Sequence, residues 1–302
     1  MCSSTYNNTP HGKLKIRISP SLNSLEFFLI REGRETLLGI IKNPLLLWDP
    51  VKIRCLSTKE IIAELFGQNT IIEYDGVSII WNYKVWPPAI DSLFLAKILR
   101  ETDYLNRNIR TVVDVGSGTG FLGIYFCVKN KAIKEVYAVD VDPEAARWTA
   151  VNAIKNNVAD RILVCVGDGL RPFREMPFAD LIICNPPYIP TPPGEASNAF
   201  NPYGGTYLLE NVITSARKYS DGELIIVYSS VSAVEVEKSK KKEKLKGEIL
   251  GRLKIPFRVP AVLSNRRWLD FLINQRGLKF YLDKKDGYYY WHEIFIERIP
   301  LS

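Results

Sequence analysis

Residues 113–120 read Val-Asp-Val-Gly-Ser-Gly-Thr-Gly, an apolar run that leads into a turn of three glycines. The run "TVVDV" (111–115) has the β-branched composition of a buried strand, and "FLGIYFCVK" (121–129) fits a helix. Glycines at such a junction let the backbone approach a ligand closely and place amide groups at the start of a helix. The stretch predicts a strand–turn–helix unit with a ligand site at its turn, formed by Gly116, Ser117, Gly118 and Gly120.

Strands and helical patterns continue to alternate on the carboxyl side of this unit. Apolar runs begin at residues 135, 161, 179 and 222, and helical patterns cover 143–157 and 205–220. Strands this apolar, separated by helices, indicate a parallel sheet covered on both faces. The aromatic run "YYYWHEIFIERI" (288–299) is expected to be antiparallel. We therefore predict an α/β fold: a Rossmann-like, doubly wound, mostly parallel seven-stranded sheet with an antiparallel edge strand, plus a smaller N-terminal region.

The N-terminal region has a less regular pattern. Three apolar segments within 13–42 fit a helix or a strand equally well, whereas residues 58–67 fit an amphipathic helix. Two β-favouring runs then flank Asp75-Gly76, which predicts a hairpin over 70–82, and a helix should follow with Asp91 or Ser92 as its N-cap. We divide the chain into an accessory, substrate-recognition region (1–68) and a catalytic domain (69–302) with a lysine-rich insertion near 236–250.

Composition narrows the class of protein. The chain has 302 residues, of which 46% are apolar and 24% charged, and no apolar stretch reaches the ~18 residues of a membrane span. The first residues lack the apolar segment of a signal peptide, so a cytoplasmic location is expected. The five cysteines form no CxxC pair, and there are only two histidines. A disulfide framework, a zinc site and histidine-based catalysis are therefore not expected, and no metal is predicted.

The net charge of +7 is concentrated in one place. Residues 238–246, "KSKKKEKLK", hold six lysines. They fit either a solvated surface helix or loop, or a contact with phosphate groups of RNA.

Polar residues stand near the ends of four successive predicted strands: Asp114, Asp140, Asp168 and Asn185. Ligands bind at the carboxyl ends of strands in open parallel sheets. Asp140 lies 20 positions after Gly120, the spacing at which an acid accepts hydrogen bonds from ribose hydroxyls. Asp168 can accept from an adenine amino group. The set predicts a nucleoside-containing cofactor, although each acid alone is also compatible with a helix or turn cap.

Two kinds of nucleoside cofactor are compatible with the glycine turn. Residues 118–123 match the GxGxxG pattern of dinucleotide sites, which is a weak signal alone. Asp114, however, stands two positions before the first glycine. A carboxylate there would repel a pyrophosphate and attract the ammonium and sulfonium groups of S-adenosylmethionine (SAM). SAM is the favoured cofactor, and an NAD-dependent oxidoreductase is the remote alternative.

Residues 184–190, Cys-Asn-Pro-Pro-Tyr-Ile-Pro, follow the fourth strand and suit a planar acceptor nitrogen. The lone pair of such a nitrogen is delocalised, and acceptors on its N–H groups favour the geometry needed for attack. The Asn185 side-chain oxygen and the Pro186 carbonyl can act as these acceptors, on a loop stiffened by proline. The ring of Tyr188 can cover the planar group. This interpretation makes Asn185, Pro186 and Tyr188 catalytic, with Asn185 also bordering the cofactor.

The motifs "DVGSGTG" (114–120), "AVDVDPEA" (138–145), "VGDGL" (166–170) and "CNPPY" (184–188) resemble, in this order, those of class I SAM-dependent N-methyltransferases. "NPPYIPTPP" (185–193), "YGGTYLLENVI" (203–213) and "VWPPAIDSLFLAKIL" (85–99) further resemble HemK-type protein glutamine N5-methyltransferases. The resemblance implies that Pro187, Pro88 and Asp91 border the substrate.

The resemblance also implies a class of acceptor. A glutamine side-chain amide of a translation factor, such as a release factor, is the first choice. Exocyclic amines of adenine or guanine in RNA or DNA remain open as the alternative, because the excess of positive charge also suits phosphate. A catalytically silent RNA-binding or scaffold subunit is a further alternative. The sequence does not indicate the oligomeric state.

Overall fold

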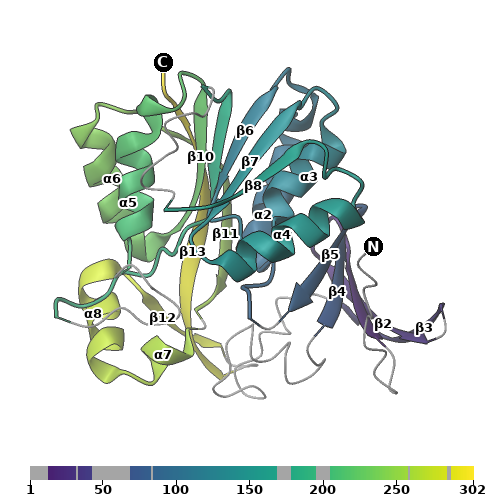
Figure 1. Cartoon of the computed structure of the whole chain (residues 1–302). Helices are drawn as coiled ribbons and strands as arrows, with labels where there is room; N and C mark the ends of the chain where they lie inside the picture. Colours follow the sequence, from purple (N-terminus) through teal and green to yellow (C-terminus); the bar gives the residue numbers. More distant parts are fainter. Residues whose placement is uncertain are drawn as a thin grey trace.

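The computed structural model describes residues 13–31, 33–42, 69–82, 84–168, 178–194, 205–257, 259–283 and 287–302. Within these residues the chain forms two β-sheets and the helices that pack around them (Figure 1). The helix expected at 58–67 lies outside the described residues, and so do residues 1–12 of the accessory region. None of the helices in the described part is long and apolar enough to cross a bilayer.

The larger sheet has the strand order β11-β13-β10-β9-β6-β7-β8, with β12 paired to β13. Its parallel strands are β6 (Thr111–Val115), β7 (Glu135–Asp140), β8 (Ile162–Val166), β9 (Leu181–Cys184) and β10 (Glu223–Ser229). β12 (Lys279–Asp283) pairs with the first part of β13. The α/β class and the mostly parallel sheet that the sequence predicts are confirmed.

The antiparallel strand β13 (Gly287–Pro300) lies one position inside the edge, between β10 and β11 (Glu248–Pro256). The aromatic segment 288–299 therefore has hydrogen-bonded neighbours on both sides. Ile294, Ile296 and Ile299 of this strand are fully buried. Their burial explains why so apolar a strand occupies an inner position, because an edge strand is usually more polar.

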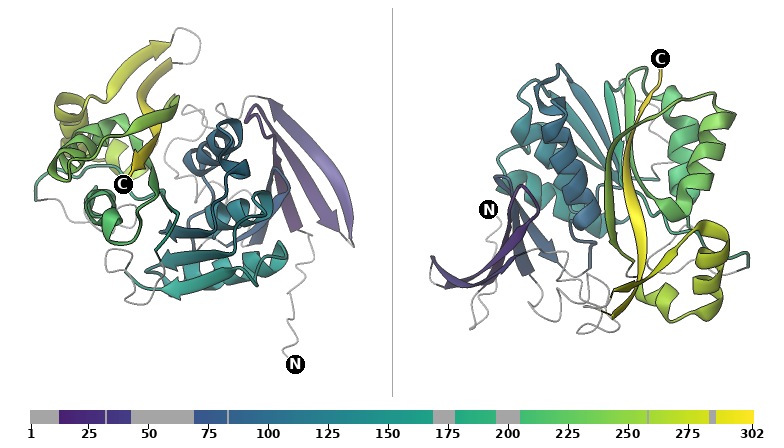
Figure 2. Two further views of the ribbon diagram at one scale, coloured as in Figure 1. Left: turned by 90° about the horizontal axis from the view of Figure 1, so that it is seen from above. Right: turned by 180° about the vertical axis from the view of Figure 1, so that it is seen from behind.

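Helices cover both faces of the larger sheet (Figures 1 and 2). One face packs against α2 (Ile90–Glu101), α3 (Phe121–Lys129) and α4 (Pro143–Lys155), and the other against α5 (Tyr207–Ser215) and α6 (Ala233–Lys242). Short 3-10 turns occur at η2 (Tyr104–Asn106), η3 (Ala216–Lys218) and η4 (Ser230–Ser232). Strand β10 shows why two cores form: Ile225 and Val227 join the first, and Leu224 and Ile226 join the second.

A small helical extension lies between β11 and β12. It consists of α7 (Pro260–Leu263) and α8 (Arg266–Arg276). Trp268 and Leu272 of α8 are buried in a separate apolar cluster with Phe257 and Val262. The extension lies on the side of the sheet where α5 and α6 pack (Figure 1).

The N-terminal sheet has the order β3-β2-β1-β4-β5. Its strands are β1 (Lys13–Ile18), β2 (Ser24–Arg31), β3 (Arg34–Lys42), β4 (Asn69–Tyr74) and β5 (Val77–Asn82). The segments of 13–42 that fit either structure are thus strands. The hairpin expected over 70–82 is formed by β4 and β5, with Asp75 and Gly76 both at positive φ. β4 pairs in parallel with β1, so this hairpin belongs by its hydrogen bonds to the N-terminal sheet.

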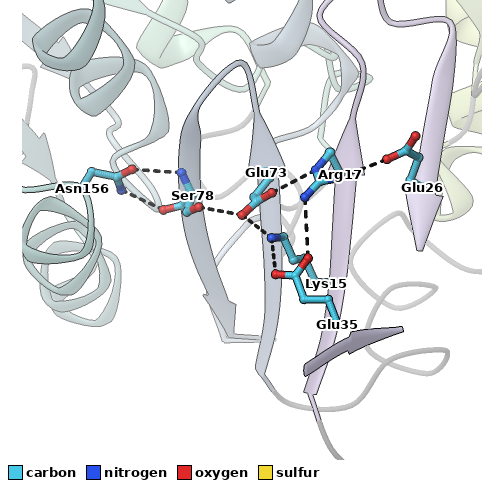
Figure 3. A network of polar contacts seen from close by, with 7 residues as sticks. All are labelled: Lys15, Arg17, Glu26, Glu35, Glu73, Ser78 and Asn156. Atoms are coloured by element: carbon cyan, nitrogen blue, oxygen red, sulfur yellow. Dashed lines mark hydrogen bonds and ion pairs between the residues drawn. The ribbon is translucent and has the colours of Figure 1, made fainter. Parts of the chain in front are cut away.

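One face of the N-terminal sheet is apolar and the other carries ion pairs. Leu14, Ile16 and Ile18 of β1 are buried in the core shared with α2 and α3. The opposite side of β1 presents Lys15 and Arg17, whose partners lie on β2, β3 and β4 (Figure 3). The alternation of apolar and charged residues along β1 therefore decides which face of the sheet packs on the core, because only the apolar face can be buried without burying charged side chains.

The N-terminal sheet is also attached to the larger domain through two asparagines, Asn152 of α4 and Asn156 at its C-cap. Asn152 accepts from the backbone N–H of Ile80 over 2.8 Å and donates to its carbonyl over 3.1 Å. Asn156, one turn later, accepts from Ser78 N–H over 2.9 Å and donates to its carbonyl over 2.7 Å (Figure 3). These side chains satisfy backbone groups along the outer edge of β5, in place of a further strand.

Candidate active site

The glycine turn lies between β6 and α3 and is built by backbone conformations that suit glycine. Gly116, Gly118 and Gly120 have φ values of +73°, +56° and +80°. A side chain at Gly120 would also collide with Thr149 of α4, since a Cβ atom there would lie 2.7 Å from the Thr149 methyl group. Gly118 is held from the same helix, because its carbonyl accepts from the Thr149 hydroxyl over 3.1 Å.

Much of the turn's amide capacity is used inside the protein. The N–H groups of Gly116 and Ser117 both donate to the Val139 carbonyl, and that of Gly120 donates to Ser117. The Gly118 N–H donates to Asp140 Oδ2 over 2.8 Å. The turn therefore offers a ligand its shape more than a cradle of free amides.

Asp114 is almost fully buried, with 1% of its surface exposed, in β6 below the turn. Its Oδ2 accepts from Gly123 N–H over 2.9 Å, in the first turn of α3. Burial raises the pKa of this carboxyl to about 7, and the charge of Asp140 adds to the shift, while the Gly123 hydrogen bond opposes it. A negative or negatively polarised group thus already occupies the start of α3.

This position decides between the two cofactor classes on structural grounds. A dinucleotide places its pyrophosphate at the N-terminus of the helix after the glycine turn. Here the Asp114 carboxyl accepts a hydrogen bond from the Gly123 N–H in that first turn. A pyrophosphate at this position would therefore lie close to the carboxylate and be repelled by it. The donor set therefore fits a cofactor with a cationic end, as SAM has, and does not fit a pyrophosphate.

Asp140 and Asp168 lie at the carboxyl ends of adjacent strands, as predicted. Asp140 ends β7 and accepts from the N–H groups of Gly118 and Asp142, the latter over 3.0 Å. Burial raises the pKa of the Asp140 carboxyl. Asp168 follows β8 and is half-buried. Both Val141 and Val166, also at this edge, expose about half of their residue surface, at 50% and 57%. No motif marks these two valines in the sequence, although each lies within two positions of one of the acids.

Asn185 follows β9 directly, and its side-chain amide is held at one end. Its Nδ2 donates to Ser92 Oγ over 2.9 Å. Its Oδ1 is buried and has no hydrogen-bond partner among the described residues. A buried acceptor without a partner is costly and calls for a ligand or a water molecule. The atom that the sequence assigned to the acceptor nitrogen is thus the one that the fold leaves available.

Tyr188 is tied to the same helix as Asn185. Its hydroxyl donates to Asp91 Oδ2 over 2.8 Å, and the other Asp91 oxygen accepts from Ser92 N–H over 2.8 Å. Burial raises the pKa of Tyr188 well above its usual value, and the Asp91 carboxylate adds to the shift. The phenol therefore remains a neutral hydrogen-bond donor, and Tyr188 is half-buried on the proline-containing loop.

The far end of this loop is held by α8. The indole Nε1 of Trp268 donates to the Pro190 carbonyl over 2.7 Å, and Arg267 donates to the Pro193 carbonyl over 2.9 Å. Asn265 caps α8 by accepting from Trp268 N–H. Residues 265–268 thus form the start of α8, with Trp268 buried.

The predicted N-cap of α2 is wrong, because the side chains of Asp91 and Ser92 bind residues of the candidate site and do not cap the helix. The cap is Ala89, without a side-chain hydrogen bond, while Asp91 and Ser92 point to the loop after β9. Pro88 is buried just before the helix, and Pro187 is half-buried within the loop. The segment ahead of α2 also passes close to the turn, since a Cβ atom on Gly118 would lie 3.8 Å from the Trp86 carbonyl oxygen.

The lysine-rich stretch lies away from these residues. Lys240 is buried and paired with Glu237 and Glu297, whereas Lys238, Lys241 and Lys242 are exposed at the end of α6. Arg217 donates both to Glu243, just past α6, and to Leu301, whose N–H bonds Gly222 ahead of β10. The end of α6 therefore lies at the amino edge of the sheet, opposite the glycine turn. Among the described residues no cluster of His, Cys, Asp and Glu is arranged to hold a metal ion.

Known proteins share these features. The family model described as "Methyltransferase small domain" matches residues 90–241. A Methanocaldococcus jannaschii protein with the provisional name protein N5-glutamine methyltransferase is 31% identical over 203 residues, which are 64% of this chain and 98% of that protein.

Two further relatives match over shorter segments. The release factor glutamine methyltransferase of Aquifex aeolicus is 40% identical over 77 residues, which are 26% of this chain and 27% of the relative. A tRNA1(Val) (adenine(37)-N6)-methyltransferase of Aeromonas hydrophila is 33% identical over 81 residues, which are 27% of this chain and 34% of the relative. The chain thus spans only about a third or less of these two proteins.

The family match covers half of the chain and includes β6 to β10 with the glycine turn, the strand-end acids and the loop after β9. The buried Asp114 at α3 and the unpaired Asn185 oxygen agree with a cationic methyl donor and an N–H acceptor. This chain belongs to the methyltransferase small domain family and is a SAM-dependent methyltransferase.

Proposed function

We propose that the enzyme methylates a glutamine side-chain amide of a translation factor. The observation that carries the proposal is the buried, unpartnered Oδ1 of Asn185, which stands ready to accept an N–H group. A glutamine amide has two N–H groups, and the Pro186 carbonyl can accept the second. The comparison that favours glutamine is the Methanocaldococcus jannaschii relative, of whose length this chain matches 98%.

The chain's own groups then prepare the acceptor for attack. Hydrogen bonds from its N–H groups to Asn185 and Pro186 favour a pyramidal nitrogen, whose lone pair is no longer shared with the carbonyl. The Tyr188 ring covers the planar group, while Asp91 holds its hydroxyl. Bound SAM supplies an electrophilic methyl group on its sulfonium sulfur. A nitrogen–carbon bond forms as the sulfur–carbon bond breaks, and the amide proton leaves to water, so the loop needs no strong base.

The predicted residues of the glycine turn and the three strand-end acids each have a proposed part in holding SAM. The turn from Gly116 to Gly120, with Ser117 and Gly118, receives the methionine part above Asp114, whose ionised form favours the ammonium group. The Asp140 carboxylate accepts from the ribose hydroxyls, and Asp168 accepts from the adenine amino group. The exposed apolar surfaces of Val141 and Val166 suit the flat face of a base.

The N-terminal region is proposed to recognise the protein that carries the acceptor. Its support is the position of the sheet β1–β5, which α4 holds against the domain that carries the glycine turn. Because β4 and β5 pair within this sheet, the proposed accessory region includes residues 69–82 as well as 13–42.

A nucleobase amine of tRNA is the second candidate acceptor. It is favoured by the match to a tRNA adenine methyltransferase and by the net charge of +7. An exocyclic amine also has two N–H groups, which can donate hydrogen bonds to the Asn185 side-chain oxygen and the Pro186 carbonyl. The exposed lysines at the end of α6 lie far from the loop, so they would contact RNA away from the reacting base.

One experiment separates the two acceptors. Tritium-labelled SAM is offered, in parallel, to purified release-factor-type proteins and to total RNA, with Asn185→Ala as the control of strongly reduced activity. Label in the protein, mapped to a glutamine, supports the proposal, and label in RNA overturns it in favour of the second candidate. For RNA, replacing Lys238, Lys241 and Lys242 with glutamine should also lower the salt dependence of binding.

A further inference from the structure

We propose that Ser92 is a positioning residue that keeps the Asn185 side-chain oxygen turned toward the acceptor nitrogen. The inference rests on the proposed function, since it gives a role to the same loop. Its starting point is a contact between two residues 93 positions apart, in which Asn185 Nδ2 donates to Ser92 Oγ over 2.9 Å.

The Asn185 amide needs such an anchor because its two ends differ in chemistry but hardly in size. Rotation of the carboxamide by about 180° replaces the oxygen acceptor with an NH2 donor. In that orientation an N–H group of the acceptor would face another N–H group, and attack would no longer be favoured. Within the described part of the chain, Ser92 is the hydrogen-bond partner that the structure gives to this amide.

Ser92 is itself held firmly. Its backbone N–H, in the first turn of α2, donates to Asp91 Oδ1 over 2.8 Å, and Asp91 Oδ2 accepts from Tyr188. Asn185 and Tyr188 are therefore bound by two adjacent residues of one helix. The hydrogen bonds and the loop backbone together form a closed ring, in which a shift of the serine would move the asparagine and the tyrosine together.

The position of the orphan atom agrees with this role. With Nδ2 satisfied by Ser92, the unpartnered atom of the amide is Oδ1, which is the atom that the proposed chemistry needs. A fold that only stabilised the loop would gain by satisfying both ends of a buried amide. Satisfying only the nitrogen end leaves an acceptor for the substrate.

The test compares Ser92→Ala with Ser92→Thr, which keeps a hydroxyl at the same position. We expect Ser92→Ala to lower kcat about 10–100-fold, with the acceptor KM and the SAM Kd within about threefold, because misplacing a reacting group costs rate more than binding. Ser92→Thr should retain at least about a third of the rate. Ser215→Ala is the matched control: it also removes a helical serine hydroxyl with one hydrogen bond, to Asn211, and it should leave kcat unchanged.

A double-mutant cycle shows whether Ser92 acts through Asn185. In an Asn185→Ala background the residual single-turnover rate should change less than about twofold when Ser92→Ala is added, because the amide to be oriented is gone. A full additional loss of rate would show that Ser92 acts elsewhere and would overturn the inference. A kcat of Ser92→Ala equal to that of the wild type would also overturn it.

Failure of the proposed function can be distinguished from failure of the inference about Ser92. If the wild-type chain transfers label to neither release-factor-type proteins nor RNA, both the proposed function and this inference fail. If transfer occurs and depends on Asn185 but not on Ser92, the inference alone fails.

An NMR measurement of the Asn185 NH2 group tests the contact without measuring activity. The signal of this group, assigned through its loss in Asn185→Ala, should shift in Ser92→Ala and stay in place in Ser92→Thr. An unshifted signal in Ser92→Ala would show that the contact is absent and would overturn the inference.

Discussion

Tyr188 donates a 2.8 Å hydrogen bond to Asp91, 97 positions earlier in the chain, and thereby fastens the loop after β9 to the first turn of α2. The acceptor is a buried carboxyl, with 8% of its residue surface exposed. This pair, together with Trp268 on the other side, holds the loop between two helices that are separate in sequence.

Tyr188→Phe should destabilise the protein by about 1.5–3 kcal/mol, the usual contribution of a hydrogen bond to a charged group, because Asp91 would remain buried with one partner fewer. Urea unfolding with a constant slope measures this change. Tyr137→Phe is the matched control, since its hydroxyl bonds Glu135 near the surface, and it should cost less than about 0.5 kcal/mol. An equal loss of unfolding free energy in the two variants would show that the buried hydrogen bond contributes no more to stability than the one near the surface.

Asn185→Ala should lower methyl transfer to a small residual rate that only single-turnover measurements detect, and it should leave SAM affinity within about threefold, because the lost contacts are to the acceptor. Isothermal titration calorimetry gives the affinity, and label transfer gives the rate. Asn106→Ala, at an exposed asparagine of η2, is the control in which both should match the wild type. Lost SAM binding in Asn185→Ala would mean that this residue serves the cofactor more than the acceptor.

Asp140→Ala should weaken SAM binding about 10–100-fold, because a carboxylate that accepts from ribose hydroxyls contributes charge-assisted hydrogen bonds. The Gly118 N–H would also lose its acceptor, which loosens the turn. Asp142→Ala serves as the comparison: it removes the N-cap of α4 and about 1 kcal/mol of stability, with SAM affinity within about threefold. A similar loss of affinity in both variants would contradict the assignment of ribose to Asp140.

SAM affinity should rise as the pH is raised through about 7, where Asp114 ionises in the folded protein. The sign follows from the raised pKa: the carboxyl is protonated at pH 6, and only its ionised form attracts the ammonium group of SAM. Asp114→Asn should bind SAM more weakly at pH 8 and show a smaller change between pH 6 and 8. Calorimetry at both pH values tests this, and an unchanged pH dependence in the variant would assign the titration to another group, such as Asp140.

The same shift predicts how the stability of the ligand-free protein changes with pH. Between the ordinary pKa of 3.8 and about 7 the folded state binds a proton at Asp114 that the unfolded state has released. Stability attributable to this group therefore falls as pH rises through that window, by up to about 4 kcal/mol at 1.36 kcal/mol for each pH unit. Asp114→Asn should remove this slope, as judged by unfolding midpoints across the window.

The asparagines of α4 should be needed to keep the N-terminal sheet attached. Asn152→Ala together with Asn156→Ala leaves backbone groups of Ile80 and Ser78 unsatisfied, so β5 should exchange its amide hydrogens faster while β6 remains protected. Asn156→Asp is the sharper control. It keeps an acceptor for Ser78 N–H but turns a second oxygen toward the Ser78 carbonyl, so it should protect β5 no better than alanine does. Unchanged exchange at β5 would show that packing alone holds the sheet.

The sequence by itself determined the parallel part of the larger sheet and the set of residues at its carboxyl edge. Runs such as 111–115 and 179–184 are mostly apolar, and local composition is enough to predict them as buried parallel strands. Because parallel strands end at one edge, Asp140, Asp168 and Asn185 could be placed together without knowing any side-chain contact.

Only the tertiary structure decided what these residues touch. Whether the segments of 13–42 are strands depended on pairing between β1, β2 and β4, since their periodicity fits two structures. Likewise, the side chains of Asp91 and Ser92 are equally suited to a helix cap and to a distant partner. They bind the loop after β9 because packing of α2 against the sheet brings that loop within hydrogen-bond range. Such contacts join residues more than 90 positions apart, and hydrogen bonding depends on distances that no local pattern of residues specifies.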